Sequence, residues 1–129
     1  MDNALMQREL GALFTYSEED MYEQISTPFL YPDGDNIDVF LMFQDEAILV
    51  ADLGETMAWL YSQSLSMRLS SKQIGLVADI CATHGVGFVN GVIETRCDSS
   101  DVASAVFRVA QVASRVSDLW LTFRARTPP

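Results

Sequence analysis

The sequence predicts an α+β fold in which a small antiparallel or mixed sheet is packed by three to five helices. Two separate segments, at about 28–52 and 87–96, are rich in β-branched and aromatic residues and are broken by turn signals. Segments with apolar residues at helical spacing precede, separate and follow them. The chain has 129 residues, of which 49% are hydrophobic, and this suits one domain spanning 1–129.

The segment 1–26 is expected to be helical. Apolar residues at helical spacing over 3–14 predict an amphipathic helix. Ser17 precedes three acids, a pattern typical of an N-cap followed by an acidic first turn. We therefore expect a short second helix that ends near Glu23.

Residues 28–52 predict a two- or three-stranded antiparallel meander. The turn at Pro32 and Gly34 separates a short extended run from the strand at 37–43, and a second turn leads into 47–51. Both longer strands are almost continuously apolar, so we expect much of the sheet to be covered on both faces.

The second half of the chain carries clear helix and hairpin signals. Ser70 and Gln73 form a capping-box pattern at a helix start, and Gly85 is placed to end that helix. Asn90-Gly91 between two apolar runs predicts a hairpin over 87–96.

A long C-terminal helix is predicted from Val102 to about Arg124, before a tail at 127–129 that is expected to be disordered. Its apolar residues repeat at heptad spacing over 102–123. This stripe is either part of the domain core, which its width favours, or a homodimer seam.

Charge is distributed unevenly along the chain. Eighteen Asp and Glu against eight Lys and Arg give a net charge of −10. Residues 1–60 contain 13 acids and one base, Arg8, a net of −12, whereas 61–129 contain 5 acids and 7 bases, a net of +2. Binding to nucleic acid or an anionic membrane depends on clustered bases, so the composition argues against both. It favours a basic surface of another protein as the partner, unless the acids form only a solvated face.

The composition also bounds the protein's location and chemistry. No apolar run reaches the roughly 18 residues of a membrane span, and the first residues carry acids where a signal peptide has bases. The protein is therefore expected to be unexported, with Cys81 and Cys97 reduced. No phosphate-loop or dinucleotide motif occurs, and no cofactor is expected. Cys81 and His84 lie three residues apart, a spacing that suits core packing and a helix end better than a catalytic pair.

Three short motifs carry a resemblance to a known family. They are the segments 27–30, 33–39 and 51–56, and later pieces match at Ser71-Lys72, Gly85-Val86-Gly87 and Ser117-Asp118-Leu119. Together they resemble the uncharacterised family called domain of unknown function 1828, which occurs mainly in bacteria, phages and prophages. The usual Asp-Asp-Gly before a helix stands here as Asp52-Leu53-Gly54. The resemblance covers roughly 25–120. It implies a mobile-element or accessory origin, hence the cytoplasm of a bacterial host, and no particular reaction.

These observations favour a small acidic module that binds a basic surface of another protein. In its sharpest form, the acids imitate phosphates and the protein inhibits a nucleic-acid-handling enzyme of host defence. The candidate partner-binding residues are Asp33, Asp35, Asp38, Asp45, Glu46, Asp52 and Glu55.

Two alternatives stay open. The first is a metal-dependent hydrolase or nuclease with Asp33, Asp35, Asp52 and Glu55 as ligands, since carboxylates bind Mg²⁺. It lacks the Glu-x-Lys expected on the second strand of one such nuclease type, and turn formation or capping also accounts for the acids. The second is a self-associating structural or regulatory subunit that uses the 102–123 helix.

Overall fold

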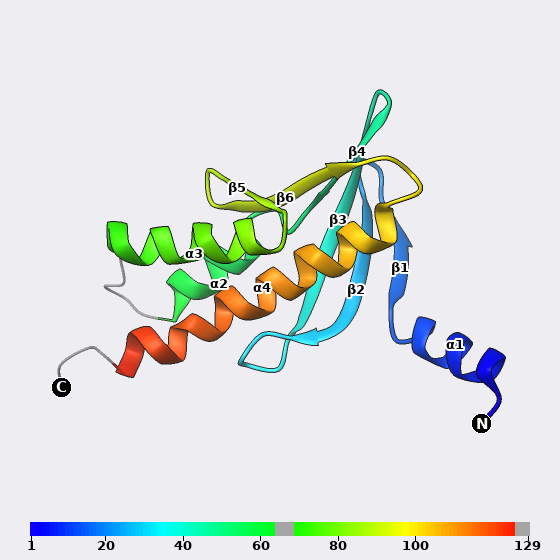
Figure 1. Cartoon of the computed structure of the whole chain (residues 1–129), viewed down its shortest axis with the longest axis horizontal. Coiled ribbons are helices and arrows are strands. Elements are labelled where there is room, and N and C mark those ends of the chain that lie inside the picture. Colours follow the sequence, from blue (N-terminus) through cyan, green and yellow to red (C-terminus); the bar gives the residue numbers. More distant parts are fainter. Residues whose placement is uncertain (64–68, 126–129) are drawn as a thin grey trace.

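The computed structural model describes residues 1–63 and 69–125, which form four helices and a six-stranded antiparallel sheet (Figure 1). The elements in chain order are α1 (Asn3–Gly11), β1 (Thr15–Glu18), β2 (Glu23–Leu30), β3 (Asn36–Gln44), β4 (Ala47–Ala51), α2 (Glu55–Ser62), α3 (Ser71–Thr83), β5 (Gly87–Val89), β6 (Val92–Cys97) and α4 (Val102–Ala125). The strand order in the sheet is β1-β2-β3-β4-β6-β5. The α+β prediction is confirmed, and the tail predicted at 127–129 lies outside the described residues.

The short helix predicted over 17–23 is wrong, because this part of the chain forms the hairpin of β1 and β2. The hydroxyl of Ser17, expected to cap a helix, donates to the carboxylate of Glu19 at 2.8 Å. The amide of Glu19 donates to the carbonyl of Tyr22 at 2.9 Å and closes the turn. Helix propensity is a weak local preference, and pairing with β2 overrides it here. The first helix also ends earlier than predicted, at Gly11.

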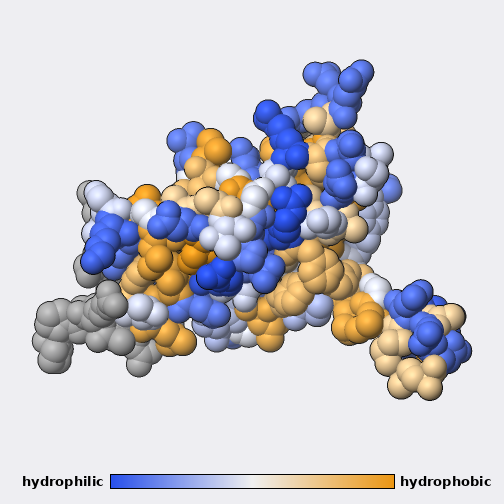
Figure 2. Space-filling view, in the orientation of Figure 1, coloured by the Kyte–Doolittle hydropathy of each residue, from blue (hydrophilic) through white to orange (hydrophobic). Residues whose placement is uncertain are grey.

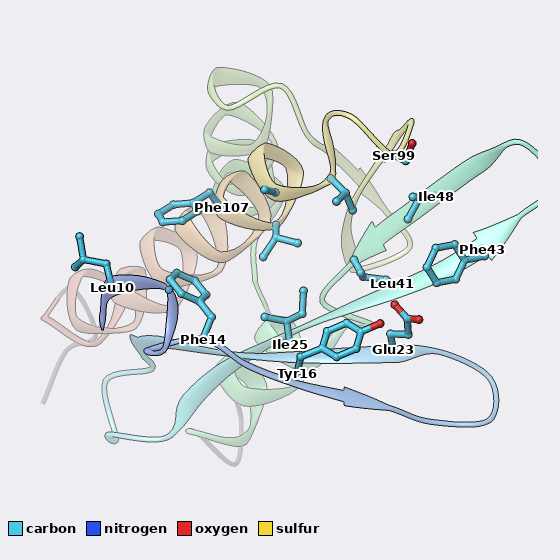
Figure 3. Close-up of a pocket in the computed structure, with 14 residues that line it drawn as sticks. Leu10, Phe14, Tyr16, Glu23, Ile25, Leu41, Phe43, Ile48, Ser99 and Phe107 are labelled. Carbon is cyan, nitrogen blue, oxygen red and sulfur yellow. The ribbon is translucent and has the colours of Figure 1, made fainter. Parts of the chain in front are cut away.

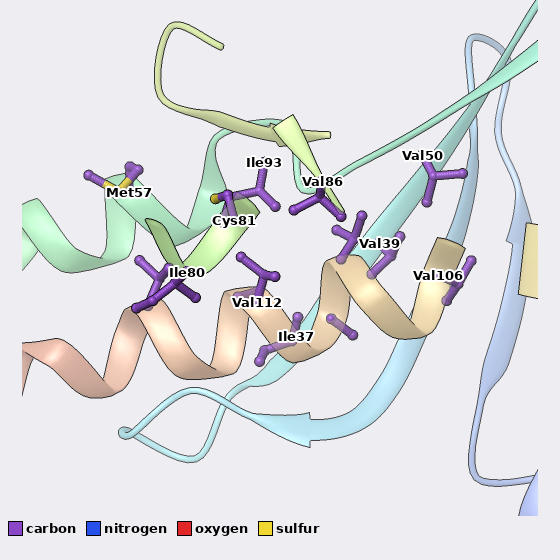
Figure 4. Close-up of a cluster of buried hydrophobic side chains, with 14 of the residues drawn as sticks. Ile37, Val39, Val50, Met57, Ile80, Cys81, Val86, Ile93, Val106 and Val112 are labelled. Carbon is purple, nitrogen blue, oxygen red and sulfur yellow. The ribbon is translucent and has the colours of Figure 1, made fainter. Parts of the chain in front are cut away.

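The central strands place alternate side chains in the core. Leu41 of β3 pairs with Val50 of β4, and Val39 lies on the same face because successive strand residues point to opposite faces. These three side chains are buried against the helices (Figure 4 labels Val39 and Val50). Phe40 points the other way and is also buried, with the ring of Tyr22 against it at 5.2 Å. The middle of β3 is therefore shielded on both faces, as its apolar run predicts.

The helix α4 lies along the sheet and contacts β2, β3, β4 and β6, while α2 and α3 pack beside it. Its heptad residues include Val109 and Val116, which are fully buried within the chain. Burying one such side chain stabilises the fold by roughly 1.5–3 kcal/mol. The stripe therefore belongs to the core, whereas Phe107 and Leu121 of the same helix are exposed.

The turn and cap signals read from the sequence have the expected geometry. Asn90 and Gly91 have φ of 51° and 81°, the two positive values that a type I′ hairpin turn needs. The amide of Gln73 donates to the Ser70 hydroxyl at 3.2 Å, and the Gln73 side chain accepts from the Ser70 amide at 2.8 Å. Gly85 has φ of 67° and follows His84, the C-cap residue of α3. Within the described ranges, none of the helices has both the length and the apolar character to span a membrane.

Candidate functional site

An open cleft of about 570 Å³ lies where the β2–β3 turn meets the first turns of α2. This is the lower end of the sheet in Figure 1. The residues that line it are Gln24, Ser26, Tyr31, Asp35, Asn36, Asp38, Glu55, Ala58 and Trp59. Three of the seven candidate acids, Asp35, Asp38 and Glu55, therefore meet in one cleft. Among the residues that the structure describes, no lysine and no arginine lines it.

A stacked aromatic pair forms one wall of the cleft. The rings of Tyr31 and Trp59 lie nearly parallel, with centroids 5.7 Å apart and an interplanar angle of 8°. Trp59 also makes an edge contact with Trp120 of α4 at 6.2 Å. Its indole N–H donates to Oδ2 of Asp33 at 2.9 Å, and Oδ1 of Asp33 accepts from the amide of Asp35 at 3.0 Å. These contacts on both sides fix the orientation of the Trp59 ring.

The tyrosine is held from behind the cleft. The Tyr31 hydroxyl and the Thr56 hydroxyl lie 3.1 Å apart and share a hydrogen bond. Burial, followed by nearby carboxylates, raises the pKa of Tyr31, so its hydroxyl stays neutral. A neutral, fixed Tyr31 presents a flat ring to Trp59 and adds no charge to the cleft.

The cleft has a negative potential that acts on its own acids. Partial removal from water, followed by the charges of Asp38 and Asp52, raises the pKa of Glu55. In contrast, the hydrogen bonds from the Asp35 amide and the Trp59 indole lower the pKa of Asp33. Asp33 is thus satisfied within the fold, whereas no charge of the described residues favours the ionised form of Glu55.

Asp52 takes a different place from the other candidate acids. It is fully buried, and its carboxylate accepts backbone N–H bonds from Gly54 at 2.8 Å, Thr56 at 3.1 Å and Ile93 at 2.9 Å. The first two bonds satisfy the start of α2, and the third links it to β6. These contacts give Asp52 a role in joining structural elements, and it offers no surface to a partner.

Asp45 and Glu46 lie at the opposite end of the sheet from the cleft. They form the turn between β3 and β4, where Asp45 has φ of 52°. Asp38, which lines the cleft, lies within β3, and only the residues 39–44 separate it from this turn, a distance of roughly 20–25 Å at the usual rise of an antiparallel strand. Since charges so far apart are screened from each other in solution, the candidate acids other than the buried Asp52 form two independent surface groups.

The alternatives raised by the sequence can also be located. In the described residues, no three His, Cys, Asp or Glu side chains come together as a metal-binding group, so Asp33, Asp35, Asp52 and Glu55 do not form one there. Cys81 is buried, which raises the pKa of its thiol to about 11, as expected for a packed core cysteine. His84 instead contacts Arg115, with Nε2 and Nη1 2.8 Å apart.

Sequence reasoning missed Tyr31 and Trp59. Both lie near candidate acids in the chain. Tyr31 precedes the predicted turn that contains Asp33, and Trp59 follows Glu55 by four positions, one helical turn. The second spacing could have indicated that Trp59 shares a helix face with Glu55. Nothing in the sequence indicates that the two rings, 28 positions apart, stack on each other.

The chain is thus a small α+β domain with an acidic, aromatic-walled cleft at one end of its sheet. The family model for a domain of unknown function, DUF1828, matches residues 27–116. Because this match spans most of the chain, the protein belongs to that family, as its motifs predict. No curated protein and no solved structure gives a significant match.

Proposed function

We propose that the protein is an acidic protein-binding module whose cleft receives a positively charged side chain of a partner. The observation that carries this proposal is the meeting of Asp35, Asp38 and Glu55 with the stacked rings of Tyr31 and Trp59. An arginine or lysine side chain suits both features. Its charge pairs with the carboxylates, and its cationic head can lie over an aromatic face, a contact of roughly 0.5–2 kcal/mol.

In its most specific form, the partner is a nucleic-acid-handling enzyme of host defence in the bacterial cytoplasm, and the protein comes from a phage, prophage or accessory element. The two acidic groups, at the cleft and at the β3–β4 turn, are separated by roughly 20–25 Å, about the length of seven nucleotide steps of DNA. A basic surface that follows a phosphate backbone would meet negative charge at both points. Such complementarity would speed association and set specificity.

The proposal makes binding dependent on pH through Glu55. The pKa of this carboxyl is raised in the free protein, and a bound cation would lower it. Binding should therefore strengthen as pH rises through the raised pKa of Glu55 and should release a proton there. A binding constant that does not change over this range would contradict a role for Glu55.

The cleft can be tested with an arginine-rich peptide labelled with a fluorophore and followed by fluorescence anisotropy. The double variant Asp38→Asn/Glu55→Gln removes two charges from the cleft with little change of shape. Its matched control is Glu9→Gln/Asp79→Asn, which removes two charges from exposed positions outside the cleft. We expect the cleft variant to weaken binding by at least about tenfold and the control by much less. If both double variants weaken peptide binding equally, the effect comes from net charge alone. The cleft is then not the binding site.

The natural partner can then be sought by affinity capture from host lysate with the wild type and both double variants. Washing at low and at high salt separates electrostatic binders from the rest. The proposal predicts a basic protein that the wild type and the control retain at low salt, that high salt releases, and that the cleft variant does not hold. A specific binder that all three proteins hold equally would contradict it.

A further inference from the structure

The helix α1 is unusual because none of its residues is buried. It is capped by Asp2, whose Oδ1 accepts from the amide of Ala4 at 3.0 Å, so its start is well formed. Its apolar side chains are nevertheless open to water, with Leu5 40% and Leu10 54% exposed. It makes no extensive contact with another helix or strand of the described chain, and Figures 1 and 2 show it projecting from the body. A helix of nine residues is marginal in water on its own, so α1 needs a surface on which to bury this stripe.

A second unpartnered apolar surface lies next to the base of α1. It is a groove of about 710 Å³ between the start of α4 and the face of β2, β3 and β4 (Figure 3). Its walls are mainly apolar and include Ile25, Leu41, Phe43, Ile48, Val102 and Phe107. Two of these aromatic side chains are open to water, since Phe43 is 60% exposed and Phe107 is 51% exposed. The groove is at the opposite end of the sheet from the acidic cleft.

The chain holds α1 beside its own groove without filling it. Phe14, which follows α1, is fixed by ring contacts with Phe107 at 5.3 Å and with Phe29 at 6.2 Å. Leu10, Gly11 and Phe14 line one side of the groove, while the part of the helix before Leu10 does not line it. Leu5 is therefore not among the residues that line it.

We propose that this groove receives α1 of a second copy of the chain, so that two copies form a reciprocal dimer. One chain supplies both halves of the contact, an unpartnered amphipathic helix and an unpartnered apolar groove, and a two-fold axis would satisfy both at once. One charge pair is available between the two surfaces, and α1 also carries the acid Glu9. Arg8 on α1 is the single base in residues 1–60, and Glu23 lines the groove.

The exposed area is sufficient for such a dimer. The large apolar or aromatic side chains of α1, its following turn and the groove are each 38–60% exposed: Leu5, Met6, Leu10, Leu13, Tyr16, Phe43 and Phe107. At roughly 80–100 Å² each, they amount to about 600 Å² on one chain, or about 1,200 Å² over two. This reaches the lower end of specific protein interfaces, which bury roughly 1,200–2,000 Å² in total.

Sedimentation velocity over a range of concentrations tests the proposal with a matched pair of variants. Leu10 and Leu121 are both 54% exposed, and only Leu10 lines the groove. We expect a wild-type dimer, a dissociation constant raised at least about tenfold by Leu10→Glu, and little change with Leu121→Glu. A wild type that stays monomeric at high concentration would overturn the proposal, as would a Leu10→Glu variant that dimerises like the wild type.

Disulfide trapping separates a second copy from closure of α1 onto its own groove. In a background of Cys81→Ala and Cys97→Ser, chains with Met6→Cys are mixed with chains with Phe43→Cys, so that a cross-link between the two variants can form only between chains. We expect a rapid mixed dimer. If mixing yields none, while a single chain with both cysteines forms an internal disulfide, the occupant is the chain's own α1 and the proposal fails.

Discussion

Replacement of Asp52 by asparagine is expected to lower the free energy of unfolding by about 2 kcal/mol. In the wild type, Oδ1 accepts from the amides of Gly54 and Ile93, and Oδ2 accepts from the amide of Thr56. An asparagine that keeps the two bonds to its oxygen places its NH₂ against the Thr56 N–H. The buried Thr56 N–H then faces another donor and lacks its acceptor, at a cost of about 1–3 kcal/mol, and the remaining two bonds lose the charge of their acceptor.

Alanine at the same position removes all three bonds and should destabilise the fold about twice as much, by roughly 4 kcal/mol. Urea unfolding followed by tryptophan fluorescence measures both changes. Asp45→Asn is the matched control, because it makes the same chemical change at an exposed turn residue whose φ of 52° asparagine readily adopts. We expect its effect to be within about 0.5 kcal/mol. If Asp52→Asn is equally mild, or if alanine is tolerated as well as asparagine, the assigned bonds do not carry the stability.

Four further predictions follow from local structure. Gly75→Ala should raise the free energy of unfolding by about 0.5–1 kcal/mol, because the new methyl group meets no atom within 4 Å inside α3; a lower melting temperature would contradict this. Ser70→Ala should lower it by about 1 kcal/mol through loss of the capping box, and an unchanged urea midpoint would show that the cap is dispensable. Cys81, buried and with a pKa of about 11, should resist a thiol reagent in the native state while the partly exposed Cys97 reacts; equal rates would refute this. Glu55→Gln should stabilise the protein at neutral pH and not at low pH. Protonated Glu55 favours the folded state, and that contribution is lost as pH rises through its raised pKa, so thermal unfolding at both pH values tests the sign.

The fold was predictable where local chemistry decides it. Asn90 and Gly91 can adopt positive φ, and Ser70 with Gln73 satisfies helix-end donors, whatever lies elsewhere in the chain. The segment 17–23 was not predictable in this way. Ser17 followed by acids suits a helix start, and only the neighbouring strand β2 makes a hairpin the better solution.

The candidate site was predictable as a set of residues and not as a surface. In the sequence, Asp38 and Asp52 look alike, since each is an acid at one end of an apolar strand segment. They differ in the structure because the Asp52 carboxylate accepts a buried hydrogen bond from the amide of Ile93. That amide lies 41 positions further along the chain. The stacking of Tyr31 on Trp59 likewise depends on a chain reversal that no local pattern encodes.

The strand order has a consequence for how the chain folds. In the described chain, every neighbouring strand pair except β4–β6 joins strands that are consecutive in sequence. The meander of β1 to β4 and the hairpin of β5 and β6 can therefore each form by closing short loops, which is fast. Joining them along β4–β6 requires α2, α3 and β5 to be looped out and should limit the rate. Because α4 contacts strands of both units, it would consolidate that late step rather than begin it.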